Sequence, residues 1–187
     1  TKLYEDPPNS IGAAYIGPIK ALINDQFDRL NDLLRFGDIP VWAWHGDVTQ
    51  SRKKKLLDNP RGILQITPES LESLLINKSA DLDRIFGDLR FVVIDEIHAF
   101  IGSDRGCQIQ CQLSRLARRT GNEPRRIGLS ATLGSYSLAE KWLQADTFRS
   151  VTTPKIEGAQ RKIQLSIEHF YDPGLVVRAK GETRDQA

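Results

Sequence analysis

The 187-residue chain contains no methionine, so it has no initiator residue, and we expect it to be a fragment of a longer protein. No apolar run approaches the roughly 20 residues that a membrane span requires. The first eight residues, TKLYEDPP, lack the apolar core of a secretory signal peptide. These absences favour a cytoplasmic protein with no membrane partner.

Cysteine is scarce. Cys107 and Cys111 are the only two, and their spacing of four places them on one face of a helix. Two thiols without a nearby pair of histidines or cysteines are too few for a structural metal site. We therefore interpret both as small residues on a buried helix face, and half of a metal site is the alternative.

A phosphate-binding loop of the form G-x-x-x-x-G-K-[ST] is also missing, because none of the 14 glycines is followed by lysine. The chain therefore lacks the loop that most often grips nucleotide phosphates. Its formal net charge of +2 is too small to argue for nucleic-acid binding. A hydrophobic share of 40% is ordinary for a globular domain, and the length is sufficient to bury a core.

Short apolar runs alternate with longer amphipathic segments, which is the pattern of a parallel sheet with helical crossovers. Strands are predicted at 11–16, 40–44, 62–66, 91–94 and 125–129. Helices are predicted at 19–36, around the basic residues 52–55, from 68 onward, at 105–120 and at 137–143. Two further β-rich stretches, 148–152 and 162–171, precede a polar linker at 181–187. The predicted fold is a three-layer α/β/α domain with a mostly parallel sheet.

One predicted strand ends in charge, since Phe91 to Ile94 leads directly into Asp95 and Glu96. Ligands of open α/β sheets bind beyond the carboxyl ends of the strands, so both carboxylates are expected at the edge of a site. Two carboxylates there suit a hydrated Mg²⁺ and a polarised water. Small polar residues follow three other strands, at 18–20, 67–69 and 130–132. With helix N-termini beside them, these ends favour nucleotide or nucleic-acid chemistry.

These segments resemble the motifs of one family. Asp95-Glu96-Ile97-His98 resembles the Walker B motif of superfamily 2 helicases in its DExH form, and Ser130-Ala131-Thr132 matches motif III. Residues 18–22 are similar to motif Ia, and Thr67-Pro68-Glu69 is similar to a later motif that contacts nucleic acid. All four stand in the order of the family. Further stretches resemble the large helicase-related (Lhr) subfamily, namely 21–26, 45–47, 97–99 and 128–134.

The resemblance implies a RecA-like fold and a role for each matching residue. Asp95 would hold Mg²⁺ through water, and Glu96 would activate the water that attacks the γ-phosphate of ATP. His98 would link the nucleotide to Ser130 and Thr132 of motif III. The implied contacts are to the phosphodiester backbone of nucleic acid, so binding would be sequence-independent and sensitive to salt. The residues implied in these contacts are Pro18, Lys20, Gly46, Asp47, Thr67, Pro68 and Glu69.

The family places its phosphate loop before the strand that begins near Ile11 and a second RecA-like domain after the first. We therefore expect residues 1–160 to form part of the first RecA-like domain, without its phosphate-loop unit. Residues 161–187 would be a strand and linker toward the second domain. The implied parent is an ATP- and Mg²⁺-dependent helicase or translocase on single-stranded or partly duplex nucleic acid. DNA is favoured over RNA, with DNA repair as the setting, and the chain alone is expected to be inactive.

Several alternatives stay open. The chain could be a RecA-like binding module without ATPase activity, or a metal-dependent nuclease that uses Asp95 and Glu96. Trp42 and Trp44 are predicted to be core residues of an inner strand, the alternative being a platform for stacked bases. Two basic clusters are either solvated surface or contacts to nucleic acid or another domain. They are residues 52–55 and the group Arg115, Arg118, Arg119, Arg125 and Arg126.

Overall fold

The computed structural model describes residues 2–154, and the residues up to Thr153 form one compact unit. A single five-stranded sheet lies at its centre, with the strand order β2-β3-β1-β4-β5. Every neighbouring pair is parallel, so the predicted α/β fold is confirmed and the sheet is wholly parallel rather than mostly so. Its strands are β1 (Ile11–Ile16), β2 (Val41–Trp44), β3 (Gly62–Ile66), β4 (Phe91–Ile94) and β5 (Arg125–Gly128).

The helices connect the strands as crossovers, as a parallel sheet requires. They are α1 (Lys2–Glu5), α2 (Lys20–Leu34), α3 (Gln50–Asp58), α4 (Pro68–Asn77), α5 (Leu82–Phe86), α6 (Asp104–Thr120) and α7 (Tyr136–Gln144). Two 3₁₀ turns are η1 (Ser79–Asp81) and η2 (Ile97–Ala99). The sequence did not predict α1, α5 or these turns, because three to five residues are too few to show a helical period.

Local sequence explains where the longer helices begin and end. Four of them start at a side chain that accepts a backbone N–H two or three residues into the helix, which is the preferred cap. These capping residues are Thr49, Thr67, Ser103 and Ser135. At the other end of α6, Gly121 adopts the left-handed conformation with φ 66°, which only glycine takes up readily.

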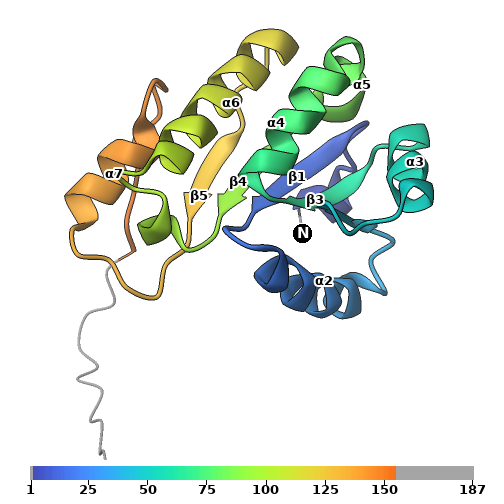
Figure 1. Cartoon of the computed structure of the whole chain (residues 1–187), viewed down its shortest axis with the longest axis horizontal. Coiled ribbons are helices and arrows are strands. Elements are labelled where there is room, and N and C mark those ends of the chain that lie inside the picture. Colours follow the sequence, from blue (N-terminus) through green and yellow to red (C-terminus); the bar gives the residue numbers. More distant parts are fainter. Residues whose placement is uncertain (1, 155–187) are drawn as a thin grey trace, which may run out of the picture. The chain divides into compact units, whose positions relative to one another are not determined.

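The core lies mainly on one face of the sheet. The side chains of Ile16, Ile66 and Ile94 are fully buried there, beneath apolar residues of α3 to α7. Burying each such side chain contributes about 1.5–3 kcal/mol. Figure 1 shows α4 and α6 together on this side of the sheet and α2 apart from them. In α2 only Ile23 is fully buried, so the second helical layer, which completes the predicted three-layer fold, is the thinner one.

The start of α6 packs unusually close to the loop before it. A Cβ atom at Gly106 would lie 1.9 Å from the carbonyl oxygen of Phe100, a distance that no other residue tolerates without a backbone shift. Phe100 is itself fully buried. Glycine at position 106 therefore fixes how closely α6 follows the acidic strand.

Two predictions about the tryptophans and cysteines need correction. β2 is an edge strand, not an inner one, although Trp44 is only 9% exposed and packs in the core. Trp42 packs partly buried against that core and donates from Nε1 to the carbonyl of Arg61 at 2.7 Å. Cys107 and Cys111 are both exposed, so the prediction of a buried face was wrong. The buried stripe of α6 passes instead through Ile109, Leu113 and Leu116.

The β-rich stretch predicted at 148–152 forms no strand in the structure, and Phe148 is fully exposed. Its aromatic and β-branched residues favour a strand only where a neighbouring strand offers hydrogen bonds. The predictions for 162–171 and 181–187, and the predicted boundary after residue 160, fall outside the described residues. Within residues 2–154, no helix is both long and apolar enough to cross a membrane.

Candidate functional site

The segments that follow the strands meet along one edge of the sheet, as predicted. We call this the strand-exit edge and define it as residues 17–20, 45–47, 67–69, 95–98 and 129–132. Backbone hydrogen bonds continue across it beyond the strands, from Gly17 N to Ile66 O at 3.1 Å and from Asp95 N to Ile16 O at 2.9 Å. A third joins Leu129 N to Ile94 O at 2.9 Å. These backbone bonds hold the chain after β3, β1, β4 and β5 in fixed register.

Asp95 is held by two hydrogen bonds. One carboxylate oxygen accepts from the backbone N–H of Glu96 at 3.0 Å, and the other accepts from the hydroxyl of Tyr15 on the neighbouring strand. Tyr15 is 8% exposed. Burial raises the pKa of Tyr15, and the hydrogen bond to Asp95 raises it further, so the hydroxyl stays a donor. Tyr15 thus orients the carboxylate, a contact that no local sequence pattern predicts.

Glu96 has a left-handed backbone, with φ 51° and ψ 48°. This conformation costs an ordinary residue about 1–2 kcal/mol. The N–H of the next residue, Ile97, offsets part of that cost by donating to Leu129 O at 2.9 Å. The buried oxygen Oε2 of Glu96 lies 3.1 Å from Nδ1 of His98 but makes no hydrogen bond of acceptable geometry. Such strain is typical of functional positions.

His98 connects the acidic strand to the segment after β5. Its Nδ1 lies 2.9 Å from Oγ of Ser130, and that hydroxyl donates to the carbonyl of Thr132 at 2.9 Å. Because the hydroxyl has one hydrogen, Nδ1 must carry the proton and donate to Ser130. The structure thus brings together His98 and Ser130, while Thr132 takes part through its backbone. No hydrogen bond joins the side chain of Thr132 to His98 in the described part of the chain.

Asp95 and Glu96 fit a hydrated Mg²⁺. They supply carboxylate oxygens, one of them buried without a hydrogen-bond donor, and Mg²⁺ usually takes one or two carboxylates with waters and substrate phosphates. Within residues 2–154, no group of three or more His, Cys, Asp or Glu side chains is placed to hold a metal ion.

Lys20, Gly46 and Asp47 lie together at the β2 end of the strand-exit edge. Nζ of Lys20 lies 3.0 and 3.2 Å from the two carboxylate oxygens of Asp47, and both side chains are exposed. The hydrogen bond from Lys20 lowers the pKa of Asp47. A Cβ at Gly46 would lie 3.3 Å from that Nζ, so glycine leaves the ammonium group its present place.

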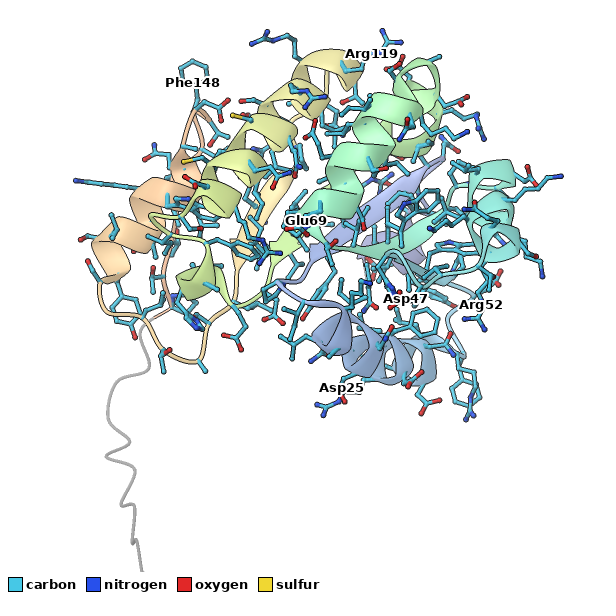
Figure 2. All side chains as sticks on the ribbon, in the orientation of Figure 1. Asp25, Asp47, Arg52, Glu69, Arg119 and Phe148 are labelled. Atoms are coloured by element: carbon cyan, nitrogen blue, oxygen red, sulfur yellow. The ribbon has the colours of Figure 1, made fainter. Side chains whose placement is uncertain are left out.

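Thr67 and Pro68 contribute mainly to the start of α4. The Thr67 side chain is buried, accepts from the N–H of Ser70 at 3.3 Å and donates to the Ser70 hydroxyl at 3.1 Å. Pro68 is buried, and its carbonyl accepts from Gln112 at 2.8 Å. The Thr67 hydroxyl is thus already engaged. What this segment presents to the edge is Glu69, more than half exposed, at the start of α4 (Figure 2).

Arg105 is a residue of this edge that the sequence did not reveal. Its Nε donates to Oε1 of Glu69 at 2.7 Å, and its Nη2 donates to the carbonyl of Pro18 at 2.7 Å. Burial is the largest single effect on Glu69 and raises its pKa, but the hydrogen bond and charge of Arg105, together with hydrogen bonds from the backbone and Thr67, hold the pKa of that carboxyl below its usual value. Arg105 therefore ties together two of the predicted nucleic-acid segments from a helix that neither belongs to.

His45 is a second residue of the strand-exit edge that the sequence did not reveal. It is 4% exposed, and its Nε2 lies 2.9 Å from Oδ1 of Asn24 in α2, so Nε2 is the protonated nitrogen. Burial lowers the pKa of His45. This contact anchors the turn that carries Gly46 and Asp47 to α2.

The arginine cluster after the acidic strand is largely engaged in ion pairs. Arg115 pairs with Glu72, Arg119 with Asp83, and Arg126 with Asp146. These contacts join α6 to α4 and α5, and β5 to the segment after α7. They support the interpretation of this cluster as structural surface.

Comparison with known proteins identifies the class of protein that has this fold and this strand-exit edge. The sequence model of the DEAD/DEAH box helicases matches residues 1–140. The chain belongs to the DEAD/DEAH box helicase family, and its RecA-like fold is that of this family.

The relatives within the family include Lhr-like helicases. The chain is 33% identical over 183 residues to the Lhr helicase/uracil glycosylase of Escherichia coli K12, covering 90% of this chain and 12% of that protein. The solved structure of Mycobacterium smegmatis helicase Lhr bound to ssDNA and AMP-PNP is similar, with a TM-score of 0.64 and 28% identity over 76% of this chain and 19% of that one. A structure of the helicase MrfA bound to DNA and AMPPNP gives a TM-score of 0.68 and 27% identity, over 81% and 22%.

The chain thus spans between 12% and 22% of the length of these relatives. The segments quoted above for the subfamily resemblance include 97–99 and 128–134, which carry His98 and Ser130. The prediction of an Lhr-like helicase fragment is confirmed.

Proposed function

We propose that this chain is part of the first RecA-like domain of an ATP-dependent helicase that moves along a single strand of nucleic acid. Residues 1–160 would belong to that domain, and residues 161–187 would lead toward a second one. The observation that carries the proposal is the strand-exit edge, where the Asp95–Glu96 pair and the His98–Ser130 contact lie beside segments with exposed charge.

Asp95, Glu96 and His98 would each have a different role at the nucleotide. Asp95, oriented by Tyr15, would hold Mg²⁺ through water, and that ion would neutralise charge on the phosphates. Glu96 would orient and deprotonate the attacking water, since phosphoryl transfer depends chiefly on positioning and charge stabilisation. His98 would pass changes at the nucleotide to Ser130 and Thr132. The fixed 2.9 Å contact between His98 and Ser130 supports that role.

The nucleic acid would lie along the other part of the edge. Lys20, Gly46 and Asp47 at one end, and Pro18, Thr67, Pro68 and Glu69 at the other, would contact its phosphodiester backbone. Backbone contacts carry no sequence information directly, so binding is expected to be sequence-independent. We favour DNA over RNA, because the similar Lhr and MrfA structures are bound to ssDNA and DNA.

We also propose that the 187-residue chain alone does not hydrolyse ATP. It contains no G-x-x-x-x-G-K-[ST] sequence, so its residues offer Mg²⁺ and water contacts but no phosphate loop. The nucleotide would be bound only when another segment supplies that loop.

The test uses the full-length protein with matched DNA and RNA duplexes that carry single-stranded overhangs. Glu96→Gln should abolish nucleic-acid-stimulated ATP hydrolysis and unwinding while leaving strand binding intact. Glu72→Gln, which changes another acidic residue of the same type on α4, is the control and should retain both activities. Wild-type turnover in Glu96→Gln would contradict the proposal. Steady, strand-stimulated turnover by the isolated chain would contradict the claim about the chain alone.

A further inference from the structure

A groove of about 420 Å³ lies beside the edge strand β2, between α3 and the segment from the end of α4 to α5. Neither the proposed nucleotide residues nor the proposed strand contacts belong to it. We call it the edge groove and define it by Trp44 and the charged side chains Lys53, Lys54, Asp58, Lys78, Asp81 and Arg84. Four of these side chains are cationic and two are acidic, so the lining carries an excess of two positive charges.

Ion pairs within residues 2–154 do not neutralise that excess. Arg84 and Asp81 pair with each other at 3.4 Å, and Arg84 also donates to the carbonyl of Leu57, so both serve as a wall of the groove. Lys54 and Lys78 have no ion-pair partner among the described residues. Lys53 has none either and lies with its ammonium 5.5 Å from the centre of the Trp44 ring. Three lysines therefore face the groove with only Asp58 to offset them.

The edge groove is continuous with the strand-exit edge along the chain. Trp44 ends β2 and lines the groove, and the residue after it, His45, begins the turn that carries Gly46 and Asp47. Asp47 lies on the connection from β2 to α3, and Arg52 lies in the first turn of α3, the helix that forms one wall (Figure 2). Lys53 and Lys54 of that helix line the groove.

The chemistry of the groove favours phosphate over bases. Trp44 is 9% exposed and its ring lies against Lys53, so it offers no open face on which a base could stack. Unpaired lysines, in contrast, bind phosphate as point charges and release counterions on doing so.

We propose that the edge groove binds the phosphodiester backbone of the same nucleic-acid strand where it leaves the strand-exit edge. Lys54 and Lys78 would contact the phosphates, while Lys53 lies over the Trp44 ring. This inference rests on the proposed function, since it assumes that the strand-exit edge holds a strand.

The test is equilibrium binding of a series of oligothymidines of increasing length to the full-length protein, over a range of salt concentrations. The variant is Lys54→Gln/Lys78→Gln, which removes two charges and keeps Lys53 on the tryptophan. The matched control is Arg118→Gln/Lys141→Gln, which removes two exposed charges from α6 and α7. For long strands the groove variant should lower the slope of log affinity against log salt by about 1.4, or roughly 0.7 for each lost contact.

Strands too short to reach the groove should bind wild type and the groove variant equally, and the control should match wild type at every length. Equal slopes for the two double variants on long strands would overturn the inference, as would an equal loss on the shortest strands. Lys54→Gln alone, an exposed change, should give about half the effect and is available if the double variant folds poorly. Failure of the wild type to bind any strand would overturn the proposed function and this inference with it.

Discussion

Arg105 donates to Glu69 through a 2.7 Å contact between Nε and Oε1, and so fixes the start of α6 against the start of α4. The same guanidinium reaches the carbonyl of Pro18, in the loop after β1. Three segments that approach the strand-exit edge from separate parts of the chain are thus held by one side chain. Its planar fork of donors is what makes two such contacts possible at once.

Replacing Arg105 should therefore affect strand binding more than stability. Arg105→Gln is expected to weaken single-strand affinity of the full-length protein several-fold, because Glu69 and the Pro18 loop lose their common anchor. The free energy of unfolding should fall by less than about 1 kcal/mol, since both partners are more than a third exposed. Fluorescence anisotropy and urea unfolding measure the two quantities.

Arg115→Gln is the matched control, because Arg115 pairs with Glu72 and also joins α6 to α4, away from the edge. It should change stability by a similar small amount and leave strand affinity unchanged. Equal losses of affinity in both variants would show that Arg105 acts only through the packing of the two helices.

The hydrogen bond between Tyr15 and Asp95 should be measurable as a coupling energy. Tyr15→Phe leaves a carboxylate oxygen without its donor, so the free energy of unfolding should fall by about 1 kcal/mol. In a double-mutant cycle with Asp95→Asn, the two changes should couple by at least about 0.5 kcal/mol. Additive losses would mean that the hydroxyl does not bind Asp95 in solution.

Gly106 should be among the positions of α6 least tolerant of substitution. Gly106→Ala would place a methyl group 1.9 Å from the Phe100 carbonyl and force the backbone apart. We expect a loss of about 2 kcal/mol in the free energy of unfolding, measured by urea titration. Gly134→Ala, where no atom lies within 4 Å of the added Cβ, should stay within about 0.5 kcal/mol of wild type. Similar losses at both glycines would contradict this account.

His45 should make stability depend on pH below neutrality. Burial lowers the pKa of His45, with Asp47 opposing and Lys20 and Lys53 adding to the shift. The unfolded state therefore binds the proton more readily, so stability is complete above the unfolded pKa of about 6.5 and is lost as pH falls below it. Between pH 7.5 and 5.5, the urea midpoint of wild type should fall more than that of His45→Gln. A parallel fall in the two proteins would remove His45 as the cause.

The strands were predictable because their signal is local. β1 and β3 begin and end where the sequence analysis placed them, since short apolar runs flanked by glycine or proline mark buried strands. Whether a β-rich stretch such as 148–152 forms a strand also depends on a neighbouring strand, which no local pattern reveals. The helical spacing of Ile109, Leu113 and Leu116 can be read from the sequence. It places these three residues on the buried face of α6 and Cys107 and Cys111 on the exposed face.

The candidate site was predictable only where a motif spans adjacent residues. Asp95, Glu96 and His98 are close in sequence, and Ser130 was found through its resemblance to a family motif. Tyr15 lies 80 residues from its partner Asp95, and Arg105 lies 36 residues from Glu69. Contacts of that kind are created by the strand order and carry no sequence pattern of their own.

The central place of β1 has a consequence for how the chain is made. Its two neighbours in the sheet, β3 and β4, both come later in the sequence, so β1 has no partner when it first leaves the ribosome. An apolar strand with two open edges must wait for Gly62–Ile66 and then Phe91–Ile94 to be synthesised. Sheets built from such distant pairings fold slowly, and until they are complete their unpaired strand edges are exposed and prone to aggregation. The early part of this chain is therefore expected to depend on chaperones or on slow translation until residue 94 has emerged.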